Sequence, residues 1–440
     1  VRGQRQRPHS HGDGPRRARG DLPPIFYIKT CNGLIMNKRV LIVVAVLIPL
    51  LVIGGILLGE GEKTPSEPQD QTSETETPTE TTDNSNETPI ESLTTESDYP
   101  KIASWLAKKE ELIESGKPYD LVMAGWFTPE EAGQLRENNP DVLLLAGLTT
   151  TWVWDNPDWM NFLVTVANYG MDTPVEINED MYLHDAEGER CGFGWASEEW
   201  NHEEIYAMDP RDPEWFDLIT TFYSVVLDQP QHDGIIVDMV VEKQYWCPEI
   251  SDEEWLEATK DIYDTIAALN TQDKLVIFNA GARLSDIDEY GEYFDGYLME
   301  NFMGDQLQTT YADGLEAAES DYIVIYNVDT DDTGIEDKAK MRLGLTLSLL
   351  NDNTYFTYDF GPRDHGQAWW YSEYDVELGD PLGDYYTQNG AYIREFENGY
   401  VVSAPNGATV SFDESLTDVT NGESGTSFTV EAGDGRIYTR

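Results

Sequence analysis

The stretch His232-Asp-Gly-Ile-Ile-Val-Asp-Met-Val-Val-Glu242 decides the fold of this chain. Its apolar residues follow one another almost without interruption, as in a strand that is buried on both faces of a parallel sheet. The run carries two carboxylates, Asp238 and Glu242, towards its C-terminal end. In (β/α)-barrel enzymes the catalytic acids stand at the C-terminal ends of such strands. The stretch therefore predicts a barrel strand that presents an acid.

Short apolar runs alternate with amphipathic helical patterns over residues 99–360. Together with 234–241, the runs lie at 120–127, 142–148, 205–208, 275–280, 297–302, 322–328 and 354–360. Helix start signals such as Thr128-Pro129 lie between them. Strands that alternate with helices form parallel βαβ units, and eight units match one (β/α)8 TIM barrel. A doubly wound open sheet is the alternative, which the lack of a glycine-rich dinucleotide loop disfavours.

The last part of the chain changes to short alternating strands. Asn398-Gly399 lies between two of them, a dipeptide typical of a tight hairpin turn. We therefore expect residues 98–385 to form the barrel and residues 386–440 to form a small antiparallel β-domain.

The N-terminal residues differ from the rest in composition. Residues 1–39 are rich in Arg, Pro and Gly and are predicted to be disordered, and Met36 begins a pattern typical of a natural start, which would make residues 1–35 an upstream extension. Residues 40–58 are apolar and just long enough to span about 30 Å of hydrocarbon. Residues 59–97 are mainly Thr, Glu, Ser and Pro, which predicts a disordered tether.

Basic residues precede the apolar run, and they set its expected orientation. Lys38 and Arg39 place the N-terminus in the cytoplasm by the positive-inside rule. We expect a single-pass protein of the cell membrane whose C-terminal domain is extracytoplasmic. A cleaved signal peptide is the alternative, but the run is long for one and no clear A-x-A site follows.

Charge and cysteine content limit the partners. The formal net charge of −55 argues against nucleic acid, because phosphate would be repelled, and fits an acidic surface that works in high salt. Cys31 precedes the apolar run, so at most Cys191 and Cys247 can pair outside the cell. The sequence has no CxxC motif and no Cys/His cluster, so we predict neither a metal site nor a cofactor.

Polar residues stand at the ends of the predicted strands. Asp238 and Glu300 are the leading candidates, because each follows an apolar run within its own strand. Such positions face a partly desolvated barrel mouth, where the pKa of a carboxyl rises. A pair of carboxyl groups suits glycosidic bond cleavage. We predict Asp238 as the nucleophile or base and Glu300 as the proton donor.

Other residues at the same edge are candidates for substrate binding. They are Trp126, Asp209, Asn279, Asn301, Asn327, Asp359, Arg363, His365 and Trp369. The tryptophans would stack on sugar faces, and the polar groups would hydrogen-bond to substrate. Each also has a structural interpretation, since tryptophans fill cores, asparagines cap helices and a buried acid can belong to a salt bridge.

Two segments resemble a known group. The run 232–238, preceded by Met208-Asp-Pro-Arg-Asp-Pro-Glu-Trp215, resembles the hypothetical glycoside hydrolases of TIM-barrel fold and, more distantly, the polygalactosaminidase-type barrels. Trp369-Trp-Tyr371 and Arg394-Glu-Phe-Glu-Asn-Gly399 resemble the final segment and appended β-domain of the same group. The likeness covers about residues 118–440.

The resemblance implies a carbohydrate-active enzyme with one acid on strand four, here Asp238, and another on strand six, here Glu300. It names no sugar. The leading hypothesis is therefore a membrane-anchored, extracytoplasmic glycoside hydrolase that cleaves a poly- or oligosaccharide. A non-catalytic carbohydrate-binding or scaffold protein is the alternative, and a carboxyl separation far above about 9.5 Å would favour it. A metal-dependent deacetylase-like hydrolase is a third hypothesis, which the lack of a His-rich strand end disfavours.

Overall fold

A computed structural model describes residues 99–193, 205–244, 246–281, 287–302, 307–320 and 322–440. The predicted membrane span at 40–58 and the tether at 59–97 lie outside these residues. Among the helices of the described ranges, none combines the length and the apolar character that a bilayer crossing requires.

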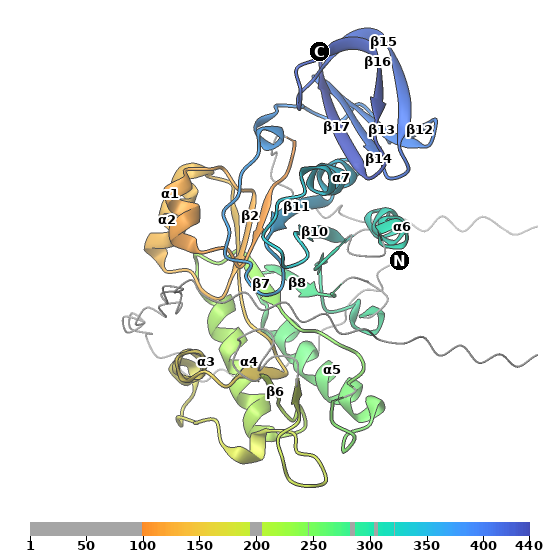
Figure 1. The fold of residues 1–440 in the computed structure, drawn as a ribbon. Coiled ribbons are helices and arrows are strands. Elements are labelled where there is room, and N and C mark those ends of the chain that lie inside the picture. The colour runs from red at the N-terminus through yellow and green to blue at the C-terminus, as the bar shows by residue number, and fades with distance from the viewer. Residues whose placement is uncertain (1–98, 194–204, 245, 282–286, 303–306, 321) are drawn as a thin grey trace, which may run out of the picture. The chain divides into compact units, whose positions relative to one another are not determined.

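Eight parallel strands form a nearly closed barrel (Figure 1). In order around it they are β1 (Ala103–Trp105), β2 (Leu121–Ala124), β3 (Leu143–Ala146), β7 (Gly234–Val237), β8 (Leu275–Asn279), β9 (Gly296–Met299), β10 (Ile323–Asp329) and β11 (Thr354–Asp359). A single parallel bridge between Ile102 and Phe356 brings the first strand beside the last. The predicted parallel barrel of eight strands is confirmed.

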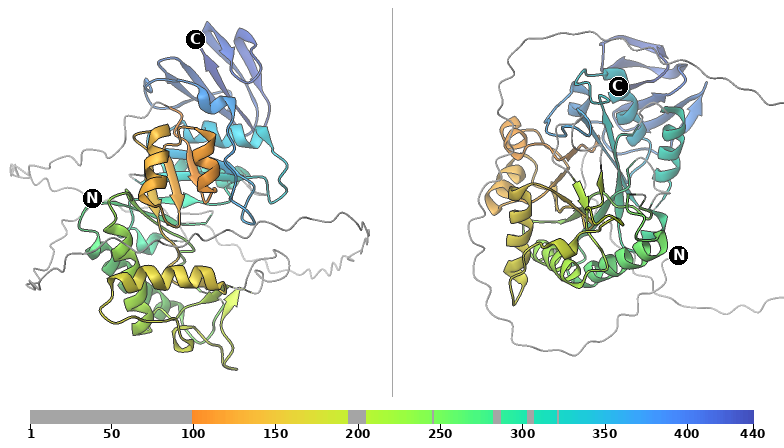
Figure 2. Two further views of the ribbon diagram at one scale, coloured as in Figure 1. Left: turned by 90° about the vertical axis from the view of Figure 1, so that its left-hand side faces the viewer. Right: turned by 60° about the horizontal axis from the view of Figure 1, so that its bottom comes forward.

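Helices lie around the outside of the strands (Figure 2). They are α1 (Lys109–Ser115), α2 (Pro129–Asn138), α3 (Pro157–Gly170), α4 (Pro213–Leu227), α5 (Asp252–Leu269), α6 (Leu307–Ala318) and α7 (Lys338–Ser348), with short 3₁₀ turns at Glu179–Met181, Asp288–Tyr290 and Ser372–Asp375. Thr128 and Ser251 form capping boxes at the starts of α2 and α5, which satisfy backbone N–H groups of the first turn.

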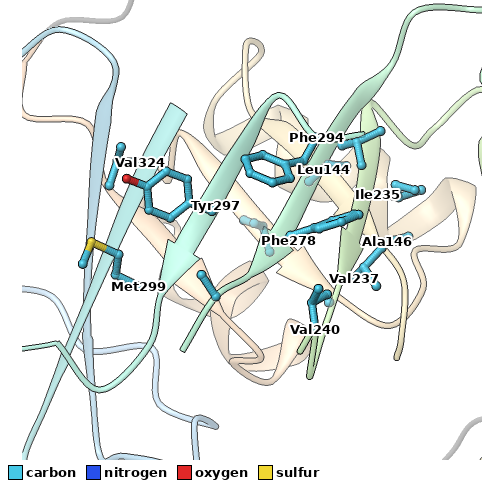
Figure 3. Packing of buried hydrophobic residues seen from close by; sticks show 14 of the residues in the cluster. Leu144, Ala146, Ile235, Val237, Val240, Phe278, Phe294, Tyr297, Met299 and Val324 are labelled. Carbon is cyan, nitrogen blue, oxygen red and sulfur yellow. The ribbon is translucent and has the colours of Figure 1, made fainter. Parts of the chain in front are cut away.

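The main core lies between the strands and the helices. Outward-facing strand residues such as Val237 and Phe278 belong to it, and Figure 3 shows them together with Phe294 and Tyr297. The helices contribute large side chains such as Trp215, which is fully buried. A second, smaller cluster fills the inside of the barrel. Burial on both faces explains why these strands read as continuous apolar runs.

The predicted strand at 205–208 is not part of the barrel. Ile205–Ala207 (β6) pairs antiparallel with β4 (Trp152–Trp154) and β5 (Gly192–Phe193) in a separate sheet. We call the segment from β4 to β6, which lies between barrel strands β3 and β7, the insertion. The apolar residues of β6 pack in a separate buried cluster there. The first barrel strand is instead β1, whose three residues are too few to stand out as a run. The run at 205–208 was counted wrongly and β1 was missed, so the number of strands before 232–242 is unchanged. This stretch therefore still supplies strand four of the barrel.

A disulfide holds this insertion to the barrel. Cys191, beside β5, is bonded to Cys247, which lies in the segment between β7 and α5. Both cysteines are buried in the cluster of the insertion. The one pair that the sequence allowed outside the cell is therefore formed.

The C-terminal residues form the predicted antiparallel sheet. Its strands are β12 (Tyr386–Gln388), β13 (Ala391–Phe396), β14 (Gly399–Ala404), β15 (Ala408–Asp418), β16 (Ser424–Val430) and β17 (Asp434–Thr439), in the order β12-β13-β14-β17-β15-β16. The hairpin of β13 and β14 is present, but Gly399 already pairs with Phe396. A Cβ on Gly399 would lie 2.0 Å from the Tyr438 carbonyl oxygen, so close strand packing requires this glycine. The Asn-Gly turn with positive φ at both residues is Asn389-Gly390.

A buried ion pair joins the β-domain to helix α7. Arg342 donates to both carboxylate oxygens of Asp434 at 2.9 Å, and the two side chains are only 11% and 6% exposed. Nearby, a Cβ on Gly435 would lie 2.1 Å from Thr346 Oγ1, so the glycine permits the close approach of β17 to α7. The pair fixes the β-domain on the helix layer.

Replacement of Arg342 by Met keeps most of the side-chain volume and removes one partner of the pair. Such a loss costs about 3–5 kcal/mol because the other charge stays buried. Arg436 also contacts Asp434, so we expect the free energy of unfolding in a urea titration to fall by roughly 3 kcal/mol. The control K260M removes the cation of the exposed pair with Glu289 and should have a smaller effect. An R342M variant with wild-type stability would contradict the docking role of the pair.

Candidate active site

The inner face of the barrel changes from apolar to polar towards the C-terminal ends of β7 to β11. The buried cluster inside the barrel contains Ile236, Ile277, Leu298, Ile325 and Tyr355. Successive side chains of a strand point to opposite faces, so residues two or four positions further on share that inner face. Those residues are Asp238, Asn279, Glu300, Asn327 and Asp359. The strand period therefore gathers the polar strand ends at one place.

One amide group joins the two candidate catalytic carboxyl groups. Asn279 Nδ2 donates to Asp238 Oδ1 at 2.7 Å and to Glu300 Oε2 at 2.8 Å. The Gly281 N–H donates to Asn279 Oδ1 at 2.9 Å, which fixes the orientation of the amide. Because both bonds leave one nitrogen, the two facing oxygens cannot be farther apart than the total of the two lengths, 5.5 Å.

The second oxygen of Glu300 also faces nitrogen atoms. Trp105 Nε1 donates to Glu300 Oε1 at 3.2 Å, and His365 Nε2 lies 2.8 Å from the same oxygen. The other ring nitrogen of His365 lies 2.9 Å from Asp359 Oδ2, which also accepts a hydrogen bond of 2.8 Å from Asn327 Nδ2. A continuous chain of polar contacts therefore runs from Asp238 to Asn327.

Burial and neighbouring charge set the protonation of these groups. Burial, together with the charge of Glu300, raises the pKa of Asp238 to about 6. Burial acts in the same direction on Glu300, but the hydrogen bond and charge of His365 outweigh it and lower the pKa of Glu300. Burial opposes the charging of His365, but Asp359 and Glu300 outweigh it and raise the pKa of the imidazole well above its usual value.

The backbone after each carboxyl group is unusual. Met239 follows Asp238 with φ 55°, and Asn301 follows Glu300 with φ 53°. Residues other than glycine adopt the left-handed region infrequently, and such residues cluster at active sites. The turn at Met239 directs its own N–H to Asp238 Oδ1 at 2.8 Å.

Residues 160–400, more than half of the chain, match the family described as hypothetical glycosyl hydrolase family 15. The chain belongs to this family. By family it is a glycoside hydrolase, a carbohydrate-active enzyme whose substrate is unknown. A search of the curated proteins found no match.

Solved structures with a similar arrangement include several carbohydrate-active enzymes. An alpha-amylase from Lactobacillus plantarum is 11% identical, over 77% of this chain and 98% of that one, with a TM-score of 0.45. An alpha-galactosidase from Geobacillus stearothermophilus in complex with raffinose is 12% identical, over 78% of this chain and 56% of that one, with a TM-score of 0.43. Similarity at this level identifies no substrate for the family 15 chain.

Four of the predicted substrate-binding residues of this family 15 member bond to other groups of the protein. The amide of Asn279 uses its nitrogen on the two carboxyl groups and its oxygen on the backbone. Both ring nitrogens of His365 face carboxylates, and its side chain is only 6% exposed. Asn327 and Asp359 are buried behind it. The four residues therefore surround and orient the carboxyl pair, and their hydrogen bonding to substrate stays a prediction.

Three further predicted residues lie apart from this group. Trp126 is buried between strands and helices, where its ring packs 4.7 Å from that of His232. Asp209 accepts hydrogen bonds from Arg211 after β6, outside the barrel strands. Arg363 is exposed, 3.7 Å from Asp332. Their roles in substrate binding stay predictions.

Two predicted residues stay candidates for substrate contact. The side chain of Asn301 is exposed directly after Glu300, while its N–H donates to Asn327 Oδ1 at 3.4 Å. Trp369 is half-buried in the segment after β11, with its ring 5.8 Å from that of Tyr358. Their roles remain predictions.

Sequence reasoning missed Trp105. It is the last residue of β1 and contacts both Glu300 and the ring of His365, at 6.0 Å between ring centroids. The short run Ile102-Ala-Ser-Trp105 carried the signal, since it is mostly apolar and ends in an aromatic donor. Its four residues were too few to mark a strand beside the longer runs.

Replacement of Asp238 by Asn should stabilise the chain at neutral pH. The folded-state pKa of about 6 lies above the ordinary value of 3.8, so the stability that the protonated acid contributes is lost as pH rises through 6. Asn cannot ionise, so at pH 7 we expect the free energy of unfolding of D238N to exceed that of the wild type by about 1–3 kcal/mol. Below about pH 4 the gain should vanish.

Chemical denaturation of both proteins at the two pH values measures this difference. The control D233N removes a carboxylate that accepts from Arg136 and from the Leu144 N–H, and it should lose stability at pH 7. A D238N variant that is less stable than the wild type at pH 7 would show that the ionised carboxylate of Asp238 stabilises the fold, which would contradict this prediction.

Proposed function

We propose that the chain is a retaining glycoside hydrolase that uses Asp238 and Glu300 as its two carboxyl groups. One observation carries the proposal, the shared amide of Asn279, which limits the facing oxygens to 5.5 Å. Retaining enzymes hold their carboxyl groups about 5–5.5 Å apart, and inverting enzymes about 6.5–9.5 Å apart to admit a water molecule. An upper limit of 5.5 Å between the nearest oxygens supports the closely spaced pair of a retaining enzyme over the wider spacing of an inverting one.

The proposed reaction has two steps that together consume one water molecule. One carboxylate attacks the sugar carbon C1 as the bond from C1 to the leaving oxygen breaks, and the other carboxyl group gives its proton to that oxygen. Water then attacks C1, the ester bond to the protein breaks, and the proton of the water returns to the second carboxyl group. Both groups end as they began, and a poly- or oligosaccharide is cleaved.

We further propose that this enzyme is anchored in the cell membrane by residues 40–58 and acts outside the cytoplasm. The apolar run after Lys38 and Arg39 supports this orientation. The disulfide between Cys191 and Cys247 gives independent support, because disulfides persist in oxidising compartments.

Fractionation of cells that express the full chain tests the location. The chain should remain with the membranes after a high-salt wash, and a protease added to intact cells should cleave it between residues 59 and 97. A control chain that lacks residues 40–58 should leave the membrane fraction. A full chain that is released by the wash, or is protected from the protease, would contradict the proposal.

The reaction itself is tested with the full chain on a panel of p-nitrophenyl glycosides and unmodified poly- and oligosaccharides, at low and high salt. D238N and E300Q should each lower kcat/KM by at least about 10²-fold, as expected for loss of a group that transfers a proton or attacks. The control E242Q makes the same change at Glu242, which accepts a hydrogen bond from the Glu289 N–H, and should keep wild-type activity.

On any substrate that is cleaved, proton NMR of the first product should show the anomeric configuration of the substrate. An inverted product would contradict retention. Full activity of both D238N and E300Q would exclude this carboxyl pair, and binding of a glycan without cleavage would identify the alternative carbohydrate-binding protein.

A further inference from the structure

We propose that His365, held as an imidazolium between Asp359 and Glu300, is a positioning residue that makes Glu300 the carboxylate of the pair and leaves the transferable proton on Asp238. The inference rests on the proposed function and deepens it, because it assigns the two roles. It reverses the assignment expected from the sequence, in which Asp238 attacks and Glu300 donates the proton.

The surroundings of the ring favour the charged form. Nδ1 lies 2.9 Å from Asp359 Oδ2 and Nε2 lies 2.8 Å from Glu300 Oε1. A neutral imidazole has one N–H, whereas an imidazolium has two, so only the charged ring donates to two carboxylates. Asn327 donates to the same oxygen of Asp359, which favours the anionic form of that acid.

The hydrogen bonds of the two catalytic candidates differ in number. Glu300 faces three nitrogen donors, with Trp105 and His365 at Oε1 and Asn279 at Oε2. Asp238 accepts two hydrogen bonds, both at Oδ1, from Asn279 and the Met239 N–H. Among the described residues, nothing bonds to Asp238 Oδ2. Donors stabilise an anion, and a carboxyl proton needs an oxygen that does not already face an N–H. The proton therefore belongs on Asp238 Oδ2.

The charged neighbours agree with this distribution. Asp359 and Glu300 face the ring directly, Asp238 lies beyond Glu300, and Asp329 pairs in register with Asp359. Lys340 lies 3.6 Å from Asp329 and offsets that acid. The direction of each pKa supports the same assignment, since the pKa of Glu300 is lowered and that of Asp238 is raised.

The proposed first step follows from this assignment. A Glu300 oxygen forms the bond to C1, the bond from C1 to the leaving oxygen breaks, and the proton of Asp238 goes to that oxygen. In the second step water gives its proton to Asp238 and its hydroxyl to C1, and Glu300 leaves as the carboxylate. His365 keeps its charge throughout.

Nitrogen-15 NMR of histidine-labelled full chain tests the charge of the ring without any substrate, so its failure is distinct from a failure of the proposed function. H365Q identifies the signal of His365 by its absence. His232 serves as the internal reference, because burial lowers its pKa to about 4 and it should be neutral at pH 7. We expect both ring nitrogens of His365 to carry protons from pH 5 to pH 8. A singly protonated ring at pH 7 would overturn the proposal.

The pH profile of kcat/KM provides the second test, on a substrate that the wild type cleaves. H365Q removes the charge, and D359N keeps the imidazole but removes the acid that favours its charging. In both variants the acidic limb, which reports ionisation of Glu300, should move up by at least one pH unit. A purely structural role would lower kcat/KM equally at every pH and would overturn the assignment.

The control for this profile is H184Q. His184 lies in the insertion, 2.9 Å from Glu179, and its replacement should leave the profile unchanged. Thermal unfolding of each variant confirms that it is folded. If H365Q does not fold, D359N decides the question, because it changes no atom of the ring.

Discussion

The amide nitrogen of Asn279 donates to Asp238 and to Glu300, and the chemistry of the barrel mouth depends on this shared contact. Two unit charges about 5 Å apart repel by roughly 3 kcal/mol at an effective dielectric constant of about 20. That energy corresponds to about two pKa units, and it acts together with burial, the larger cause, to raise the pKa of Asp238 from 3.8 to about 6. The pair therefore holds one proton across a range of pH in which separate carboxyl groups would hold none.

The fold supplies this contact through the alternation of its strands. Aliphatic side chains fill the inside of the barrel up to Ile236, Ile277 and Leu298, and the next inward position of each strand carries a polar group of the site. The site is thus built on strand ends that are anchored by a packed core, and its positions are fixed more closely than those of loop residues. The β-domain docks on α7 through Arg342, and within the described part of the chain it makes no hydrogen bond to the carboxyl network.

Sequence patterns predicted most of the barrel strands and the polar residues at their ends, but they did not predict the contacts that those residues make. Asp238, Asn279 and Glu300 were found because each ends a long apolar run. The run at 205–208 had the same appearance but belongs to the insertion, because apolar periodicity reports burial and does not say in which cluster a strand is buried. The roles of His365 and Trp105 depend on their contacts with Glu300, which lies more than 60 positions away from each in the chain, so no local pattern contains them. For the same reason the sequence could not tell which acid keeps the proton.

The most direct test of this account is to trap the glycosyl–protein intermediate. The full chain is mixed with a 2-fluoro derivative of a glycoside that it cleaves, which slows the second step, and the labelled peptide is identified by mass spectrometry. We expect a single glycosyl adduct on Glu300. An adduct on Asp238 would contradict the assigned roles, and product formation without any adduct would contradict the retaining mechanism.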